Sequence, residues 1–144
     1  MKTINIPPTN GKNKKIAIIL PYFNEHIGLE LLDETLKELL KAGVAKKNIK
    51  IFRVPGALEI PFTAKKILKE QKFDAIIALG VVIRSETYHF ELVCSETFHG
   101  LMQISLSALT PIIFGILTVE NEKQARNRIK KGKDFARSAL FMTL

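Results

Sequence analysis

Short apolar segments alternate with amphipathic segments along this chain, and that alternation limits the fold more than any other feature. The apolar segments 15–20, 48–54, 74–80 and 111–117 have the length and the isoleucine, valine and leucine content of buried strands. Segments 27–42, 61–71, 89–109 and 121–143 have helical character, the last with a break near Gly132. Strands separated by helices pair in parallel, because each helix carries the chain back to the edge of the sheet at which the preceding strand began.

We therefore predict an α/β fold, a flavodoxin-like three-layer sandwich in which a four-stranded parallel sheet carries helices on both faces. The 144 residues fit a single domain over 1–144, and a content of 47% hydrophobic and 25% charged residues is enough to build a core. Residues 1–13 are expected to form an extended N-terminal segment that lies across a neighbouring subunit or is mobile.

Composition excludes several classes of protein. The N-terminus lacks the apolar run of a signal peptide, and no apolar stretch reaches the roughly 18–20 residues of a membrane helix, so we predict a cytoplasmic protein that does not engage a membrane. The formal net charge is +8, but the basic residues are spread along helix faces without interleaved aromatics, which disfavours nucleic-acid binding. His26, His89 and His99 show no metal-ligand spacing. The single cysteine, Cys94, is interpreted as a packing residue, with a reactive thiol as the alternative.

The candidate site follows from where parallel strands end. Ligands of open α/β sheets bind beyond the carboxyl ends of the strands. Phe23 follows the first predicted strand, Glu59 lies in the loop after the second, and residues 84–89 follow the third. The imidazole of His89 can act as base and acid near neutrality, and a helix N-terminus favours its neutral, basic form. Residues 85–87 can direct backbone N–H groups at a phosphate, although the GxxxxGK[ST] and GxGxxG spacings are absent.

Each candidate also has an ordinary structural explanation. Phe23 could belong to the core, where a large aromatic after a buried strand is common, or stack on a flat heterocycle. Glu59 could cap a backbone turn or accept hydrogen bonds from ligand hydroxyls. His89 could be a polar residue of a helix start. Arg128 would suit a phosphate, but it could equally be a solvated helix residue.

Four segments together resemble the signature regions of the lumazine synthase family. They are FN at 23–24, VPGALEIP at 54–61, GVVIRSETYHF at 80–90 and PIIFGILTVENEKQARNR at 111–128, and the match extends over about residues 15–140. The resemblance implies a transferase of riboflavin biosynthesis. That enzyme condenses 5-amino-6-(D-ribitylamino)uracil with 3,4-dihydroxy-2-butanone 4-phosphate to 6,7-dimethyl-8-ribityllumazine, releasing phosphate and water. It implies no metal and no organic cofactor.

The resemblance further implies a role for each site residue. Two residues would be catalytic: His89 as general base and proton shuttle, and Arg128 as the phosphate-binding cation. The substrate-binding residues would be Phe23 against the pyrimidine, Leu58, Glu59 and Ile60 along the ribityl chain, Val82 and Ile83 around the ring, Ser85, Glu86 and Thr87 at the phosphate, and Phe114 and Lys131. The family supplies Arg128 and Phe114 from the adjacent subunit.

Four features depart from the family pattern. Ser85 stands where glycine is usual, Leu58 where a larger aromatic is common, and Pro21–Tyr22 where a basic residue is more usual. The stretch between Arg128 and Gly132 is several residues shorter than in many bacterial members. The family lysine could therefore be Lys131 or Lys133; we prefer Lys131, because it directly precedes Gly132.

The resemblance also bears on partners. It implies a homopentamer or a sixty-subunit icosahedral capsid with the site at the subunit interface, and riboflavin synthase as a candidate partner. The broadly apolar helix 89–109 fits packing against both the sheet and another subunit. The alternatives are a non-catalytic lumazine- or flavin-binding relative, a cage whose assembly matters more than turnover, and a basic nucleic-acid module.

Overall fold

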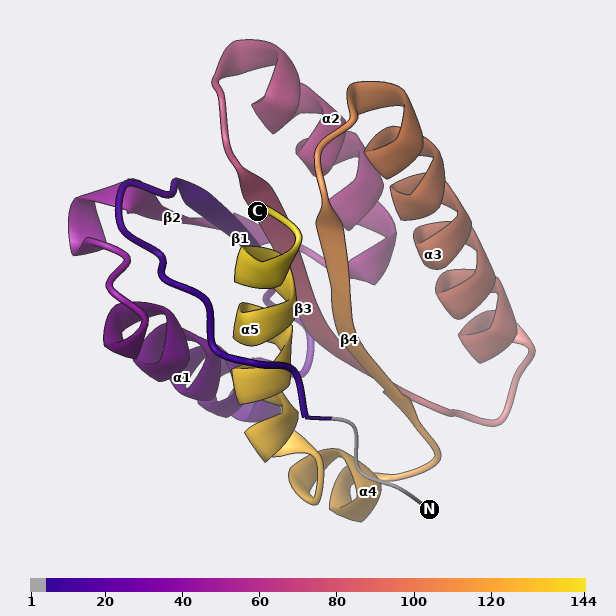
Figure 1. Cartoon of the computed structure of the whole chain (residues 1–144). Coiled ribbons are helices and arrows are strands. Elements are labelled where there is room, and N and C mark those ends of the chain that lie inside the picture. The colour runs from indigo at the N-terminus through magenta and orange to yellow at the C-terminus, as the bar shows by residue number, and fades with distance from the viewer. Residues whose placement is uncertain (1–4) are drawn as a thin grey trace.

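The computed structural model describes residues 5–144 and contains, in that range, a sheet of four parallel strands (Figure 1). The strands are β1 (Ile16–Pro21), β2 (Ile49–Val54), β3 (Ala75–Ile83) and β4 (Ile112–Val119), in the spatial order β2-β1-β3-β4. Every pairing is parallel, as strands joined by helical crossovers require. The predicted flavodoxin-like three-layer α/β fold is confirmed.

Helices cover both faces of this sheet. Helices α1 (Glu25–Lys41) and α5 (Gly132–Phe141) pack on one face, and α2 (Ile60–Glu70) and α3 (His89–Ala108) on the other (Figure 1). Shorter helical elements connect them, namely η1 (Lys46–Asn48), η2 (Ala57–Glu59), α4 (Glu122–Arg126) and η3 (Ile129–Lys131). None of the helices in residues 5–144 is long and apolar enough to cross a membrane.

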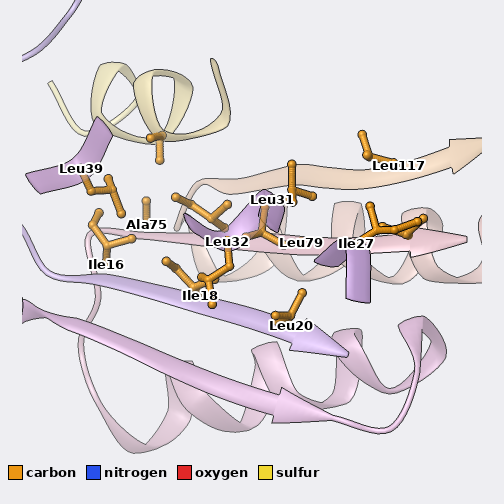
Figure 2. Close-up of a cluster of buried hydrophobic side chains, with 14 of the residues drawn as sticks. Ile16, Ile18, Leu20, Ile27, Leu31, Leu32, Leu39, Ala75, Leu79 and Leu117 are labelled. Atoms are coloured by element: carbon orange, nitrogen blue, oxygen red, sulfur yellow. The ribbon is translucent and has the colours of Figure 1, made fainter. Parts of the chain in front are cut away.

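The core consists of two layers that share the central strands. Ile16, Ile18 and Leu20 of β1 meet α1, as Figure 2 shows, whereas Ala17 and Ile19 point to the α2–α3 side. All five side chains are fully buried. A strand covered on both faces must be apolar at every position, which explains the uninterrupted IAIIL run. Burial of one such isoleucine or leucine contributes about 1.5–3 kcal/mol to folding.

Two strands run further than their apolar patterns predict. Strand β3 continues from Gly80 to Ile83 because those residues pair in parallel with β4, and β4 continues to Val119 for the same reason. Val82 and Ile83 are therefore strand residues and not loop residues. The predicted break in the last helical segment is present, since α4 and η3 precede α5, which begins at Gly132.

The N-terminal segment can be followed from residue 5, and residues 1–4 lie outside the described residues. Residues 5–11 have no helix or strand, and their hydrogen bonds reach Ala42, directly after α1, and Arg137 of α5. Gly11 N donates to Ala42 O at 2.8 Å, and Arg137 Nη1 donates to Ile6 O at 3.0 Å. Arg137 also pairs with the buried Glu38 of α1 at 3.1 Å, so this segment covers a largely buried ion pair.

Candidate active site

A cavity of about 480 Å³ opens where β1, β2 and β3 end. It lies at the carboxyl edge of the sheet, where ligands of this class of fold bind. It is lined by Pro21, Phe23, Asn24, Pro55, Gly56, Ala57, Leu58, Glu59, Val81, Val82, Ile83, Ser85, His89, Phe90 and Val93. Seven of the predicted site residues are in this lining: Phe23, Leu58, Glu59, Val82, Ile83, Ser85 and His89.

The loop after β1 presents Phe23 to this cavity. Tyr22 N donates to Val54 O and Phe23 N to Pro55 O, so the backbone is bound to the end of the neighbouring strand. Asn24 adopts a left-handed conformation, with φ of 58°, and its Nδ2 donates to Val81 O at 2.9 Å. The Phe23 side chain is nevertheless 73% exposed. An aromatic ring held out from a fixed backbone is available to stack on a planar ligand, whereas a core role is incompatible with this exposure.

The loop after β2 forms the opposite wall. Glu59 Oε1 accepts a hydrogen bond from Gly56 N at 3.1 Å and so closes the turn that contains η2. Glu59 therefore does cap a backbone turn, and as an exposed residue it still presents carboxylate to the cavity. Ile60 begins α2 and is fully buried in the core, so its side chain does not line the cavity.

The β3–α3 connection supplies the third wall. Val82, Ile83 and Ser85 line the cavity, and His89 is the first residue of α3. The His89 side chain is exposed and lines the cavity. Thr87 Oγ1 accepts a hydrogen bond from His89 N at 3.3 Å. Glu86 and Thr87 are exposed in the turn and are not among the lining residues.

Sequence reasoning missed Arg84, which joins three elements around this connection. Its guanidinium pairs with Glu91 in the first turn of α3 and with Glu120 after β4, at 2.8 Å from Nε to Oε2. It also lies 4.4 Å from the centre of the Phe90 ring. The hydrogen bond from Arg84 holds the pKa of Glu91 below its ordinary value. An arginine directly after an apolar strand, with a glutamate in the following helix, was the available signal.

The remaining predicted residues lie elsewhere. Phe114 is half-buried in β4 and packs on Phe98, with ring centres 5.4 Å apart. Arg128 and Lys131 are exposed around η3, and Lys133 is exposed in α5. Among the described residues, 5–144, none of those that line the cavity is a lysine or an arginine. A phosphate bound in this cavity would therefore need a cation from outside the lining.

Two other predictions concern cysteine and metal. Cys94 is half-buried in α3, and burial raises the pKa of its thiol, which favours a packing residue over a reactive thiolate. Within residues 5–144 no three histidine, cysteine, aspartate or glutamate side chains are grouped as a metal site would require.

Known proteins resemble this chain over nearly its full length. The sequence model of the 6,7-dimethyl-8-ribityllumazine synthase family matches residues 13–144. The protein of that name from Azoarcus sp. is 47% identical over 134 residues, which cover 92% of this chain and 86% of the relative. The one from Cupriavidus necator is 44% identical over 138 residues, covering 94% and 83%. One from Neisseria meningitidis is 45% identical over 141 residues, covering 97% and 89%. This chain belongs to the 6,7-dimethyl-8-ribityllumazine synthase family.

Proposed function

We propose that this protein condenses 5-amino-6-(D-ribitylamino)uracil with 3,4-dihydroxy-2-butanone 4-phosphate to form 6,7-dimethyl-8-ribityllumazine. The observation that carries the proposal is the cavity at the strand ends, where an exposed phenyl ring, a carboxylate and an imidazole line one space of about 480 Å³. Membership of the family supports the identity of both substrates. The reaction needs few catalytic groups, because holding two reactants together supplies much of the rate.

The larger substrate fits the apolar side of the cavity. Phe23 stacks on the pyrimidine ring, with Val82 and Ile83 at the ring edge. Leu58 and Glu59 border the ribityl chain, and the carboxylate accepts hydrogen bonds from its hydroxyls. Ile60 acts through the position of the α2 N-terminus, since its side chain is buried.

The chemistry is a sequence of proton transfers. The amine of the uracil attacks the ketone and water leaves, which gives a Schiff base. Loss of a proton from the carbon chain then expels inorganic phosphate. The enol that is left takes up a proton on its terminal carbon and becomes a ketone. The ribitylamino nitrogen attacks this new carbonyl, and a second water leaves as the ring closes. His89 takes and returns protons in these steps, because it is the imidazole that lines the cavity.

The phosphate is bound between two subunits. Ser85, Glu86 and Thr87 approach it from one chain through the turn before α3. Arg128 and Phe114 come from the adjacent subunit, and Arg128 is the cation that the described lining of the cavity lacks. Lys131 fills the role of the family lysine. Lys131 is preferred over Lys133 because it directly precedes Gly132.

The assembly is a homopentamer or a sixty-subunit capsid built from pentamers. Only Val93, Thr97 and Leu101 of α3 are buried within one chain. The opposite face exposes Leu92, Met102 and Leu106, by 51%, 50% and 67%, and Phe62 of α2 is 73% exposed. Neighbouring subunits cover this apolar surface. The enzyme acts in the cytoplasm, and riboflavin synthase is the partner that consumes the product.

The deciding experiment follows lumazine formation by absorbance, with both substrates and chelator present. We expect product from the wild type, and a loss of about 100-fold or more in kcat for His89→Ala with the oligomer intact. His99→Ala is the matched control, because His99 is an exposed histidine of the same helix that does not line the cavity. A folded wild-type oligomer that forms no lumazine would refute the proposal.

A further inference from the structure

Helix α4 is too short to be stable by itself. It has five residues, Glu122–Arg126, and isolated helices need about 12–15 residues to persist in water. Local hydrogen bonds close its N-terminus, since Asn121 Oδ1 accepts from Gln124 N at 2.9 Å and Gln124 Oε1 from Glu120 N at 2.7 Å. These bonds define the start of α4, and the fully buried Ala125 attaches the helix to the core.

A histidine–carboxylate hydrogen bond and an ion pair connect α4 to α1. His26 Nε2 lies 2.5 Å from Glu122 Oε1, and Arg126 Nη1 lies 3.0 Å from Glu30 Oε2. The partners are four residues apart on each helix, so the two pairs are stacked one helical turn apart. Arg126 Nε also lies 3.7 Å from Glu122 Oε2 and links the pairs. We call these four residues the α1–α4 ladder.

The ladder has a distinctive charge arrangement. Acidic and basic partners alternate between the helices: α1 contributes the histidine and Glu30, and α4 contributes Glu122 and Arg126. The hydrogen bond from His26 lowers the pKa of Glu122, which keeps this carboxylate ionised. Single exposed ion pairs contribute little to stability, but a linked network can define the position of a short helix.

One end of the ladder leads to Arg128. Arg128 Nη1 donates to Gln124 O and its backbone N donates to Ala125 O, both at 2.9 Å. The guanidinium is therefore tied directly to the α4 backbone. A shift of α4 moves this cation with it.

The other end leads to the cavity of the same chain. His26 follows Asn24 by two residues in the first turn of α1, and the Asn24 side chain is bonded to Val81 O beside Phe23. The ladder thus joins the loop that presents the aromatic ring to the segment that carries the cation. These parts are far apart in sequence, His26 and Glu122 being separated by 96 positions.

We propose that the α1–α4 ladder is a positioning device that sets where Arg128 is presented to the adjacent subunit. The inference rests on the proposed function, in which Arg128 binds the substrate phosphate across the interface. Each subunit gives Phe23 to one cavity and Arg128 to the next. The ladder therefore connects, through a single chain, two neighbouring cavities. His26, Glu30, Glu122 and Arg126 touch no substrate and act through Arg128.

Charge reversal tests the ladder. Glu30→Arg and Arg126→Glu each place like charges opposite one another, and each is expected to raise the KM for the butanone phosphate by about three- to tenfold. The KM for the uracil substrate and the kcat should stay near wild type. The double swap Glu30→Arg/Arg126→Glu restores opposite charges between positions 30 and 126 but not between 122 and 126, so it should recover part of the change in KM.

The matched control is Lys37→Glu. Lys37 lies on the same helix as Glu30, and its exposed ion pairs, within the part of the chain that the structure describes, are with Asp33 at 3.1 Å and Glu34 at 3.9 Å, both also in α1. The substitution should leave both KM values unchanged. Equal rises in both KM values for the reversal variants, with a lower Tm and no rescue by the swap, would show general damage and overturn the proposal.

A second readout does not depend on turnover. Hydrogen exchange of peptide 120–131 should be faster in each reversal variant and slower again in the swap, because the amides of Ala125, Asn127 and Arg128 are bonded within this segment. A wild type that forms no lumazine would refute the proposed function but not the role of the ladder in holding α4. Unchanged exchange in both single variants would refute the ladder, whatever the activity.

Discussion

The contact of α5 with α1 depends on the absence of a side chain at Gly132, and Gly132→Ala tests this. A Cβ there would lie 2.7 Å from Leu31 O, 2.9 Å from Glu34 Cβ and 2.9 Å from Thr35 Oγ1. The first of these is a backbone atom inside a helix, so it cannot turn away. Ordinary contacts are at 3.4 Å or more, and α5 would have to move outward by several tenths of an ångström.

Two effects of opposite sign can be compared at this position. The φ of Gly132 is −52°, which alanine adopts without strain, so helix propensity alone predicts a gain of up to about 1 kcal/mol. Overpacking of a close contact costs about 1–3 kcal/mol, and here the contact is with backbone. We expect the cost to exceed the gain and the unfolding free energy to fall by about 1–3 kcal/mol. For a chain of this size that lowers the Tm by about 3–10 °C.

The assay is thermal unfolding at one fixed protein concentration, because assembly makes the Tm depend on concentration. Gly56→Ala is the control: its φ is −146° and the nearest atom to a new Cβ is Glu59 Oε1 at 3.5 Å. It should change stability by no more than about 0.5 kcal/mol. A Gly132→Ala variant as stable as the wild type, or more stable, would refute the reasoning.

Two further predictions concern the site. Phe23→Ala should leave the Tm unchanged, because Phe23 is 73% exposed. The KM for the uracil substrate should rise about three- to tenfold, because the stacking contact is lost, and an unchanged KM would remove Phe23 from the site. Arg84→Met should lower the Tm at pH 7. Because Arg84 depresses the pKa of folded Glu91, the pair stabilises above the unfolded value of about 4.3 and its effect disappears as pH falls further. A Tm difference that persists undiminished at the lowest pH of the scan would contradict this.

Several features followed from the sequence because they depend on near neighbours. The unbroken apolar run at 16–20 requires cover on both faces, and alternation with helices requires parallel strands. Parallel strands end at one edge, so the order of residues along the chain was enough to place Phe23, Glu59 and His89 around one cavity.

Other features were decided only by the tertiary structure. Strand β3 reaches Ile83 because β4 lies beside it, and Ile60 is buried because α2 turns it toward the sheet. Arg84 meets Glu120 across 36 positions, and His26 meets Glu122 across 96. A sequence pattern reports the environment of a residue within one helical turn or one strand. Pairings between distant segments depend on how whole elements pack, so they follow only once the fold has brought those elements together.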